Sequence, residues 1–446
     1  MTGFTALVAI FFGLLALTRR NNGAAVAVLI LSMLIWPEYL RFPLGLFNAS
    51  VPRFVALLLL AKAIGRGRHQ NISTCAVDRL VFWLWLWILL TTVISGATQD
   101  HLIETFGRGL DTILMYFVVR FYITTFDDMK GMVWWLALCA VLMGIIGIVE
   151  TVTGYSPYGG MTEYRTWKWF DEEPPQYRLG LMRAKGSTSV HIFFGLAMMI
   201  LTGILWSIVK GTSRNRFPSV AILFGFAGAF SSMSSGPWLG CAMIILLGLY
   251  RHRLNWIKPT LMLIAIMAIG LEIASNRHFY NLIDYLALDA HTAWYRTRLL
   301  EVAASQLYEF WLIGVGSNWP HHWGLLLDGR LHIDVVNQFL IVALYGGLPA
   351  MFLYILSHWY ALKRIVTLIR STGDSSVSKV AFHLGVVLVA LDFSTLSVGL
   401  FGPPLPLSNI LLGLIISVTA IGKLTEVSKD SLPATSLEDN KSGREN

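Results

Sequence analysis

The chain has 446 residues, of which 55% are hydrophobic and only 13% are charged, and its mean hydropathy is +0.62. About a quarter of the residues of a soluble protein are charged, so the composition excludes that class and predicts a polytopic membrane protein. The net charge of +8 comes without a basic helix or a single-strand groove pattern, which argues against nucleic-acid binding.

Apolar runs long enough to cross a bilayer recur along the chain. We predict 12 or 13 spans, at about 4–18, 23–37, 51–64, 80–97, 104–123, 131–152, 190–209, 217–233, 237–250, 258–275, 336–362, 380–397 and 405–422. The first run lacks a charged segment before it and a cleavage site after it, which predicts a retained span. The predicted fold is therefore all-α, with one membrane domain over 1–423 and a disordered cytoplasmic tail over 424–446.

Lysine and arginine fall on alternate connections, which are predicted to be cytoplasmic because short cytoplasmic loops are rich in these residues. These residues are Arg19, Arg20, Arg66, Arg68, Lys130, Lys210, Arg214, Arg216, Arg251, Arg253, Lys363, Arg364 and Arg370. The three cysteines, Cys75, Cys139 and Cys241, have no metal or redox spacing and are expected to be buried apolar residues.

Two long connections, 153–189 and 276–335, fall on the outer side and far exceed an ordinary helix connection. Their basic residues include Arg165, Lys168, Arg178, Arg183, Lys185, Arg277, Arg296, Arg298 and Arg330, and their aromatic residues include Trp167, Trp169, Tyr177, Trp294, Tyr295, Trp311, Trp319 and Trp323. Long loops that are merely solvated, and interfacial aromatic belts, would explain both sets. Arginine also binds phosphate bidentately and aromatic rings stack on sugars, so a ligand with phosphate, sugar and lipid is the sharper interpretation.

The second connection contains an amphipathic pattern from Trp294 onwards. Leu299, Val302, Ala303 and Leu307 recur at helical spacing, which predicts a helix along the outer membrane surface that ends before Gly314.

Four segments together resemble the O-antigen ligase and Wzy-type polysaccharide polymerase superfamily. They are "RAKGSTSVHIFFG" with Arg183, Gly186 and His191, "SSMSSGPWLG" from Ser231, "YRTRLLEVAASQLYEFWLIGVGSN" with Arg296 and Gly314-Val315-Gly316, and "HIDVVNQFLIVALYGGLPAMFLYI" with Asn337, Phe339, Leu340 and Gly347. The family's His before Asn is Val336 here, and His332 lies one helical turn outward on the same face. Gly236 stands where an Arg often follows the serines, so no phosphate contact is expected from that turn.

The resemblance implies a GT-C-type glycosyltransferase of the bacterial plasma (inner) membrane, with two long extracytoplasmic loops and its active site facing outward. Such an enzyme transfers a glycan from undecaprenyl diphosphate to an acceptor sugar, here a growing polysaccharide. Departure of the diphosphate calls for cations, and the attacking hydroxyl calls for a base. The catalytic candidates are Arg183, Arg296, His332 and Asp334, and the binding candidates are Arg165, Arg178, Lys185, His191, Arg298, Arg330, Asn337, Trp167 and Trp169.

Inversion at the anomeric carbon is expected, without a metal or another cofactor. The carboxylates Asp171–Glu173 allow a metal alternative, although Pro174-Pro175 favour a solvated turn. The pattern favours an exopolysaccharide polymerase, with a flippase and a chain-length regulator as candidate partners. An O-antigen ligase acting on lipid A core, a flippase for lipid-linked oligosaccharide and a structural membrane protein remain alternatives. Within the spans, Arg108 and Asp111 are expected to form a structural ion pair three residues apart.

Overall fold

The computed structural model describes residues 1–45, 47–166, 174–212, 216–251, 290–316, 319–327 and 333–430, together with 262, 266 and 329. The helices are α1 (Thr2–Thr18), α2 (Asn22–Ile35), α3 (Val51–Gly65), α4 (Ala76–Ile94), α5 (Gln99–Gly109), α6 (Met115–Tyr122), α7 (Phe126–Thr153), α8 (His191–Thr212), α9 (Arg216–Ser231), α10 (Ser235–Leu249), α13 (Ala290–Ser305), α14 (Gln338–Thr372), α15 (Ser376–Thr395) and α16 (Pro404–Asp430). The strands β1 (Arg41–Leu44) and β2 (Phe47–Ser50) form one antiparallel hairpin, and β3 (Tyr177–Arg178) and β4 (Leu181–Met182) form another.

The protein is an all-α membrane protein. In the part of the chain that is described, six helices (α4, α7, α8, α14, α15 and α16) are long and apolar enough to cross a membrane, and α1, α2, α9 and α10 are shorter apolar helices. Every predicted span corresponds to described helices except 258–275, of which only residues 262 and 266 are described. α16 continues beyond the predicted last span to Asp430. Residues 431–446 of the predicted tail lie outside the described residues.

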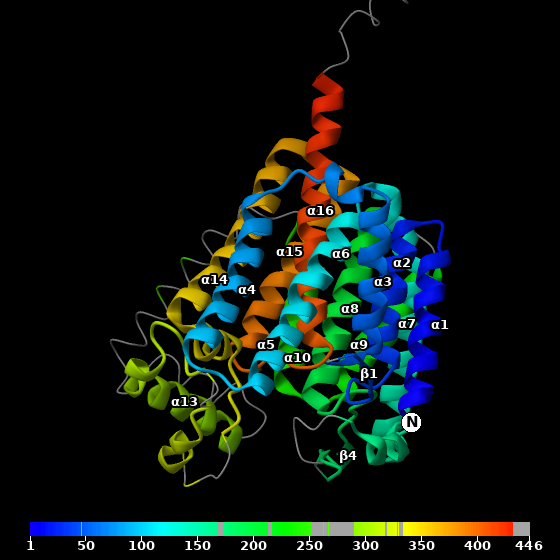
Figure 1. Ribbon diagram of the computed structural model, residues 1–446. Helices are drawn as coiled ribbons and strands as arrows, with labels where there is room; N and C mark the ends of the chain where they lie inside the picture. Colours follow the sequence, from blue (N-terminus) through cyan, green and yellow to red (C-terminus); the bar gives the residue numbers. More distant parts are fainter. Residues whose placement is uncertain are drawn as a thin grey trace, which may run out of the picture.

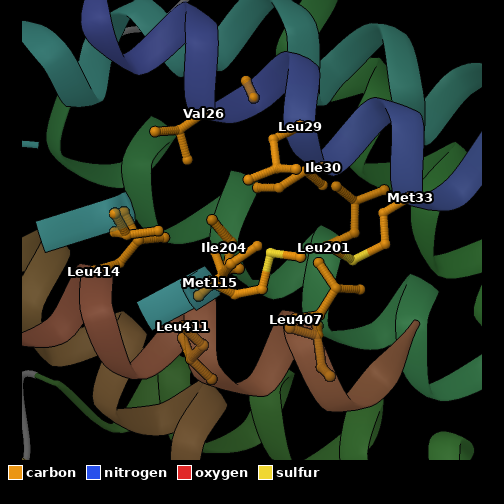
Figure 2. Packing of buried hydrophobic residues seen from close by; sticks show 14 of the residues in the cluster. Val26, Leu29, Ile30, Met33, Met115, Leu201, Ile204, Leu407, Leu411 and Leu414 are labelled. Carbon is orange, nitrogen blue, oxygen red and sulfur yellow. The ribbon is translucent and has the colours of Figure 1, made fainter. Parts of the chain in front are cut away.

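The core lies where α2, α6, α8 and α16 meet. Leu29 and Ile30 of α2, Leu201 of α8 and Leu411 of α16 are fully buried and face one another with Met115 of α6 (Figure 2). Large apolar side chains on the outside of the bundle, such as those of α1 and α4, are exposed instead. This arrangement is expected for helices whose outer surface contacts lipid.

The two ends of the bundle differ as the charge pattern predicts. The connections between α1 and α2, α3 and α4, α6 and α7, and α14 and α15 lie at the upper end in Figure 1, together with the end of α16. Both hairpins, the N-terminus and α13 lie at the lower end (Figure 1). We name this lower end the outer end, after the outer loops predicted there.

Two helices depart from regular geometry at the outer end. A π-helical turn, Leu110–Leu114, joins α5 to α6 within the predicted span 104–123. α14 is kinked at Gly346 and Gly347, and Gly347 has φ +74° and ψ −178°, a backbone conformation open essentially to glycine alone. Such interruptions often occur at functional positions of helices.

The second outer segment has a small core of its own. Leu299, Val302 and Ala303 of α13 are buried, as their spacing predicts, and they belong to a cluster with Trp323 and Leu344. Leu307 lies beyond the end of the helix and is exposed. The Gly314–Gly316 turn binds the kink of α14, because the Val315 N–H donates to the Leu344 carbonyl oxygen at 2.8 Å. The downstream glycine of the resemblance, Gly347, packs against Leu312 and Ile313, the residues that precede this turn.

Candidate functional site at the outer end

The first outer loop binds the serine-rich turn between α9 and α10 through two arginines. The Arg183 guanidinium donates to the Ser234 hydroxyl at 2.9 Å, to the Gln176 side-chain oxygen at 2.8 Å and to the Ser232 carbonyl oxygen at 3.4 Å. Arg178 donates to the Met233 carbonyl oxygen at 2.8 Å. The turn, which has no arginine of its own, thus receives two from the neighbouring loop.

Arg183 and Gln176 line a cavity of about 540 Å³, which we name the cationic cavity. Its described lining contains Gln176, Arg183, Lys185, Ser189 and His191, and no carboxylate. Within the described residues the Lys185 ammonium has neither a hydrogen-bond nor an ion-pair partner, and the buried Nε2 of His191 has no hydrogen-bond partner. A cavity with cations and no described carboxylate suits an anionic ligand.

Backbone contacts hold this loop against the bundle. Gly186 has φ +50°, and its N–H donates to the Glu150 carboxylate of α7 at 2.8 Å. The Ser187 hydroxyl donates to the Leu34 carbonyl oxygen of α2. Glu150, one of the few acidic residues in a span, therefore positions the loop that carries Arg183 and Lys185.

A second cavity, of about 340 Å³, lies beside the β1–β2 hairpin, and we name it the hairpin cavity. Its charged lining comprises Glu38, Arg41, Arg53, Asp100, Glu104, Arg108 and Asp111, and its aromatic lining includes Trp36, Phe106 and Phe401. In contrast to the cationic cavity, it mixes three guanidinium groups with four carboxylates.

The expected pairing of Arg108 with Asp111 is wrong. The Asp111 carboxylate binds Arg53 of α3 with two hydrogen bonds, of 2.8 and 2.7 Å. The Arg108 guanidinium lies 4.1 Å from the ring centroid of Tyr345 and 5.4 Å from that of Phe401. Asp111 lies in the π-helical turn, which is wider than an α-helical turn. Side chains three residues apart therefore do not share a face there as they would in a regular α-helix.

Glu38 lies at the border of the two cavities. One of its carboxylate oxygens accepts the Ser189 N–H at 3.1 Å, and the other has no hydrogen-bond partner among the described residues. Ser189 lines the cationic cavity and Glu38 lines the hairpin cavity. Burial, the largest cause, raises the pKa of Glu38, and burial followed by the charge of Arg53 lowers the pKa of Arg41 to about 10.

The last turn of α15 and the segment that follows it join the remaining motifs. The Ser394 hydroxyl donates to the Gly236 carbonyl oxygen, at the start of α10, at 3.1 Å. Asn337 donates to the Leu396 carbonyl oxygen at 2.8 Å, and Gln338 accepts the Leu400 N–H at 2.8 Å. The Arg183 segment, the serine-rich turn and the start of α14 are thus connected through direct contacts at one end of the molecule.

The structure places the other predicted residues as follows. The Arg165 guanidinium lies 5.0 Å from the ring centroid of Tyr39. Arg298 forms an exposed ion pair with the Glu301 carboxylate at 2.9 Å. Asn337 also caps α14, because its side-chain oxygen accepts the Leu340 N–H. Arg296 is buried in α13.

The segment of Asp334 is bound to α13. The hydroxyl of Tyr295, the residue before Arg296, donates to the Asp334 carbonyl oxygen at 2.8 Å, and it accepts the Asp334 N–H at 3.0 Å. The predicted residues Trp167, Lys168, Trp169, Asp171–Glu173, Arg277, Arg330 and His332 lie outside the described residues.

The hairpin cavity was not predicted from the sequence. Arg41 and Arg53 flank a short outer connection, where basic residues are disfavoured in a membrane protein, and that exception was an available signal. Asp111 was noted as a charged residue within a span, but its partner Arg53 was not predicted, and Glu38 had no comparable signal. Comparison with protein-family models finds no match, and neither does a search of curated proteins.

Proposed function

We propose that this protein is a GT-C-type membrane glycosyltransferase that polymerises oligosaccharide units carried on undecaprenyl diphosphate at the outer face of the bacterial plasma membrane. One observation carries the proposal: Arg183, which donates a hydrogen bond to Ser234 of the serine-rich turn, a separate motif of the resemblance, lines a cavity with cations and no described carboxylate. A lipid diphosphate is the anionic ligand that such a cavity in an outer membrane loop would suit.

The chemistry follows from the charge that develops during transfer. As the acceptor hydroxyl attacks the anomeric carbon, the bond to the diphosphate oxygen breaks and negative charge collects on the leaving group. Lys185 and Arg183 would stabilise that charge more in the transition state than in the bound substrate, which is the condition for catalysis. The hydroxyl proton would pass to His332 or to Asp334, and attack from the opposite face inverts the anomeric centre.

The proposal is tested by deleting the gene and complementing it with wild type, Arg183→Ala or Lys185→Ala, while the surface glycans are followed by gel and composition. We expect both variants to lose at least about tenfold in polymer yield and to accumulate single repeat units on the carrier. Lys130→Ala is the matched control, because Lys130 is exposed at the opposite end, in a pair with Asp127.

Other outcomes identify the alternatives. Full-length polymer that remains on its carrier and is absent from lipid A would indicate a ligase. Precursor retained on the cytoplasmic side would indicate a flippase. Normal polymer in the deletion strain would reject every one of these functions.

A further inference from the structure

The hairpin cavity has the lining of a site for a hydroxyl-rich ligand. Guanidinium groups only donate hydrogen bonds and carboxylates only accept them, whereas a sugar hydroxyl does both. The three arginines and four carboxylates of the lining therefore supply both the donors and the acceptors that such hydroxyls need. The carboxylates would also repel a phosphate. The volume of about 340 Å³ lies within the range of small-molecule sites.

A buried donor in this cavity points independently to a ligand. Trp36 lines the cavity and is only 8% exposed, and its indole N–H has no hydrogen-bond partner among the described residues. An indole nitrogen is a donor only, and a buried donor without an acceptor is costly. A ligand hydroxyl would supply the acceptor, and the ring itself offers an apolar face to a sugar.

The cavity wall is held rigid before any ligand arrives. Arg53 and Asp111 are fixed by their two mutual hydrogen bonds. Gly107 packs against this pair, because a Cβ there would lie 3.2 Å from a terminal nitrogen of Arg53. Because these two side chains are already fixed, they lose little conformational entropy when a ligand binds beside them.

The position of the cavity relates it to the cationic cavity. The hydrogen bond from the Ser189 N–H to Glu38 joins a residue that lines one cavity to a residue that lines the other. Ligands in the two cavities would therefore be neighbours, with an anion on one side of this contact and a neutral polyol on the other.

We infer that the hairpin cavity binds the uncharged terminal sugar of the acceptor glycan, next to the donor diphosphate in the cationic cavity. The assignment of the sugar as an acceptor rests on the proposed function. Trp36 and Glu104 are its binding residues, through the indole N–H and a carboxylate whose side chain is 39% exposed.

The experiment measures binding to the purified full-length protein in lipid nanodiscs by calorimetry. One probe is a neutral oligosaccharide released from the producing cell's own surface polysaccharide, and the other is inorganic pyrophosphate. Trp36→Phe removes the donor and keeps a ring, and Glu104→Gln removes the charge. Trp134→Phe and Glu163→Gln are matched controls, because both residues are exposed and lie outside the cavity lining.

We expect Trp36→Phe and Glu104→Gln each to weaken oligosaccharide binding by about tenfold, with pyrophosphate binding and the controls unchanged. Lys185→Ala should do the reverse. Oligosaccharide binding that is absent from wild type, or equal in wild type and both variants, overturns the inference, as does a loss of pyrophosphate binding in those variants.

The surface-glycan experiment separates the inference from the function on which it rests. Weakened oligosaccharide binding in a protein whose deletion leaves the polymer intact would keep the sugar site and reject the polymerase. A polymer lost with Arg183→Ala, combined with unchanged oligosaccharide binding in both hairpin-cavity variants, would keep the polymerase and reject the sugar site.

Discussion

Glu38, at the outer end of the molecule, makes the free energy of unfolding depend on pH. Its burial raises its pKa above the ordinary value of 4.5, so the folded protein holds this proton at a higher pH than the unfolded chain does. The free energy of unfolding therefore falls as the pH rises from about 4.5 through the pKa of the folded state, because the folded state then keeps a buried charge.

Glu38→Gln should remove this dependence. Glutamine keeps an oxygen that can accept the Ser189 N–H and carries no charge. We expect a melting temperature at about pH 7 that is equal to wild type or higher, by about 2–4 °C per kcal/mol gained, and a flatter profile towards pH 5. Thermal unfolding in detergent at several pH values measures both.

The exposed Glu163 provides the comparison for this residue. Glu163→Gln changes the same charge at the outer end without a burial cost, so it should leave the profile as in wild type. A lower melting temperature in Glu38→Gln at neutral pH, with an unchanged slope, would show that the charge of Glu38 stabilises the fold.

At the scale of elements, the kink of α14 is fixed by its contact with the second outer segment. A Cβ at Gly347 would meet the backbone carbonyl of Leu312, and the Leu348 N–H donates to the Trp311 carbonyl oxygen at 2.8 Å. Gly347→Ala should therefore destabilise the protein in two ways. It introduces backbone strain of about 1–3 kcal/mol, and it forces the kink of α14 away from the 311–316 segment.

Gly373 separates these two costs. It has φ +58°, and a Cβ there would have nothing within 4 Å. Gly373→Ala should show the strain alone, so Gly347→Ala should lower the melting temperature further and expose the 311–316 segment to proteolysis. Equal effects of the two substitutions would mean that the kink does not depend on this contact.

The elements also show what the sequence could predict. Apolar runs such as 131–152 and 190–209 coincide with α7 and α8 because the bilayer length constrains them directly. The π-helical turn and the β1–β2 hairpin were not predicted, because neither changes the average hydropathy of its segment. Arg183 was recognised as a site residue from its motif, whereas Glu38 depends on contacts between segments about 150 residues apart.

At the scale of the whole molecule, the charge pattern and the structure together define two chemically different ends. The basic short connections gather at one end and both hairpins at the other (Figure 1). The cavities lie with the hairpins, because Arg41 of β1 lines the hairpin cavity and Met182 of β4 lines the cationic cavity. The positive-inside tendency predicts that the first end is cytoplasmic and therefore that the cavities face outward. The proposed reaction requires this orientation, because its acceptor polymer grows outside the cell.

Cysteine labelling tests this orientation with little background, since Cys75, Cys139 and Cys241 are buried. Tyr155→Cys places a thiol at an exposed position after α7, at the outer end, and Asp127→Cys places one at an exposed position in the first turn of the same helix. A membrane-impermeant maleimide should label Tyr155→Cys in intact spheroplasts, and it should label Asp127→Cys only after permeabilisation. The opposite pattern would put both cavities in the cytoplasm, and a polymerase working there would have no access to glycan on the outer face.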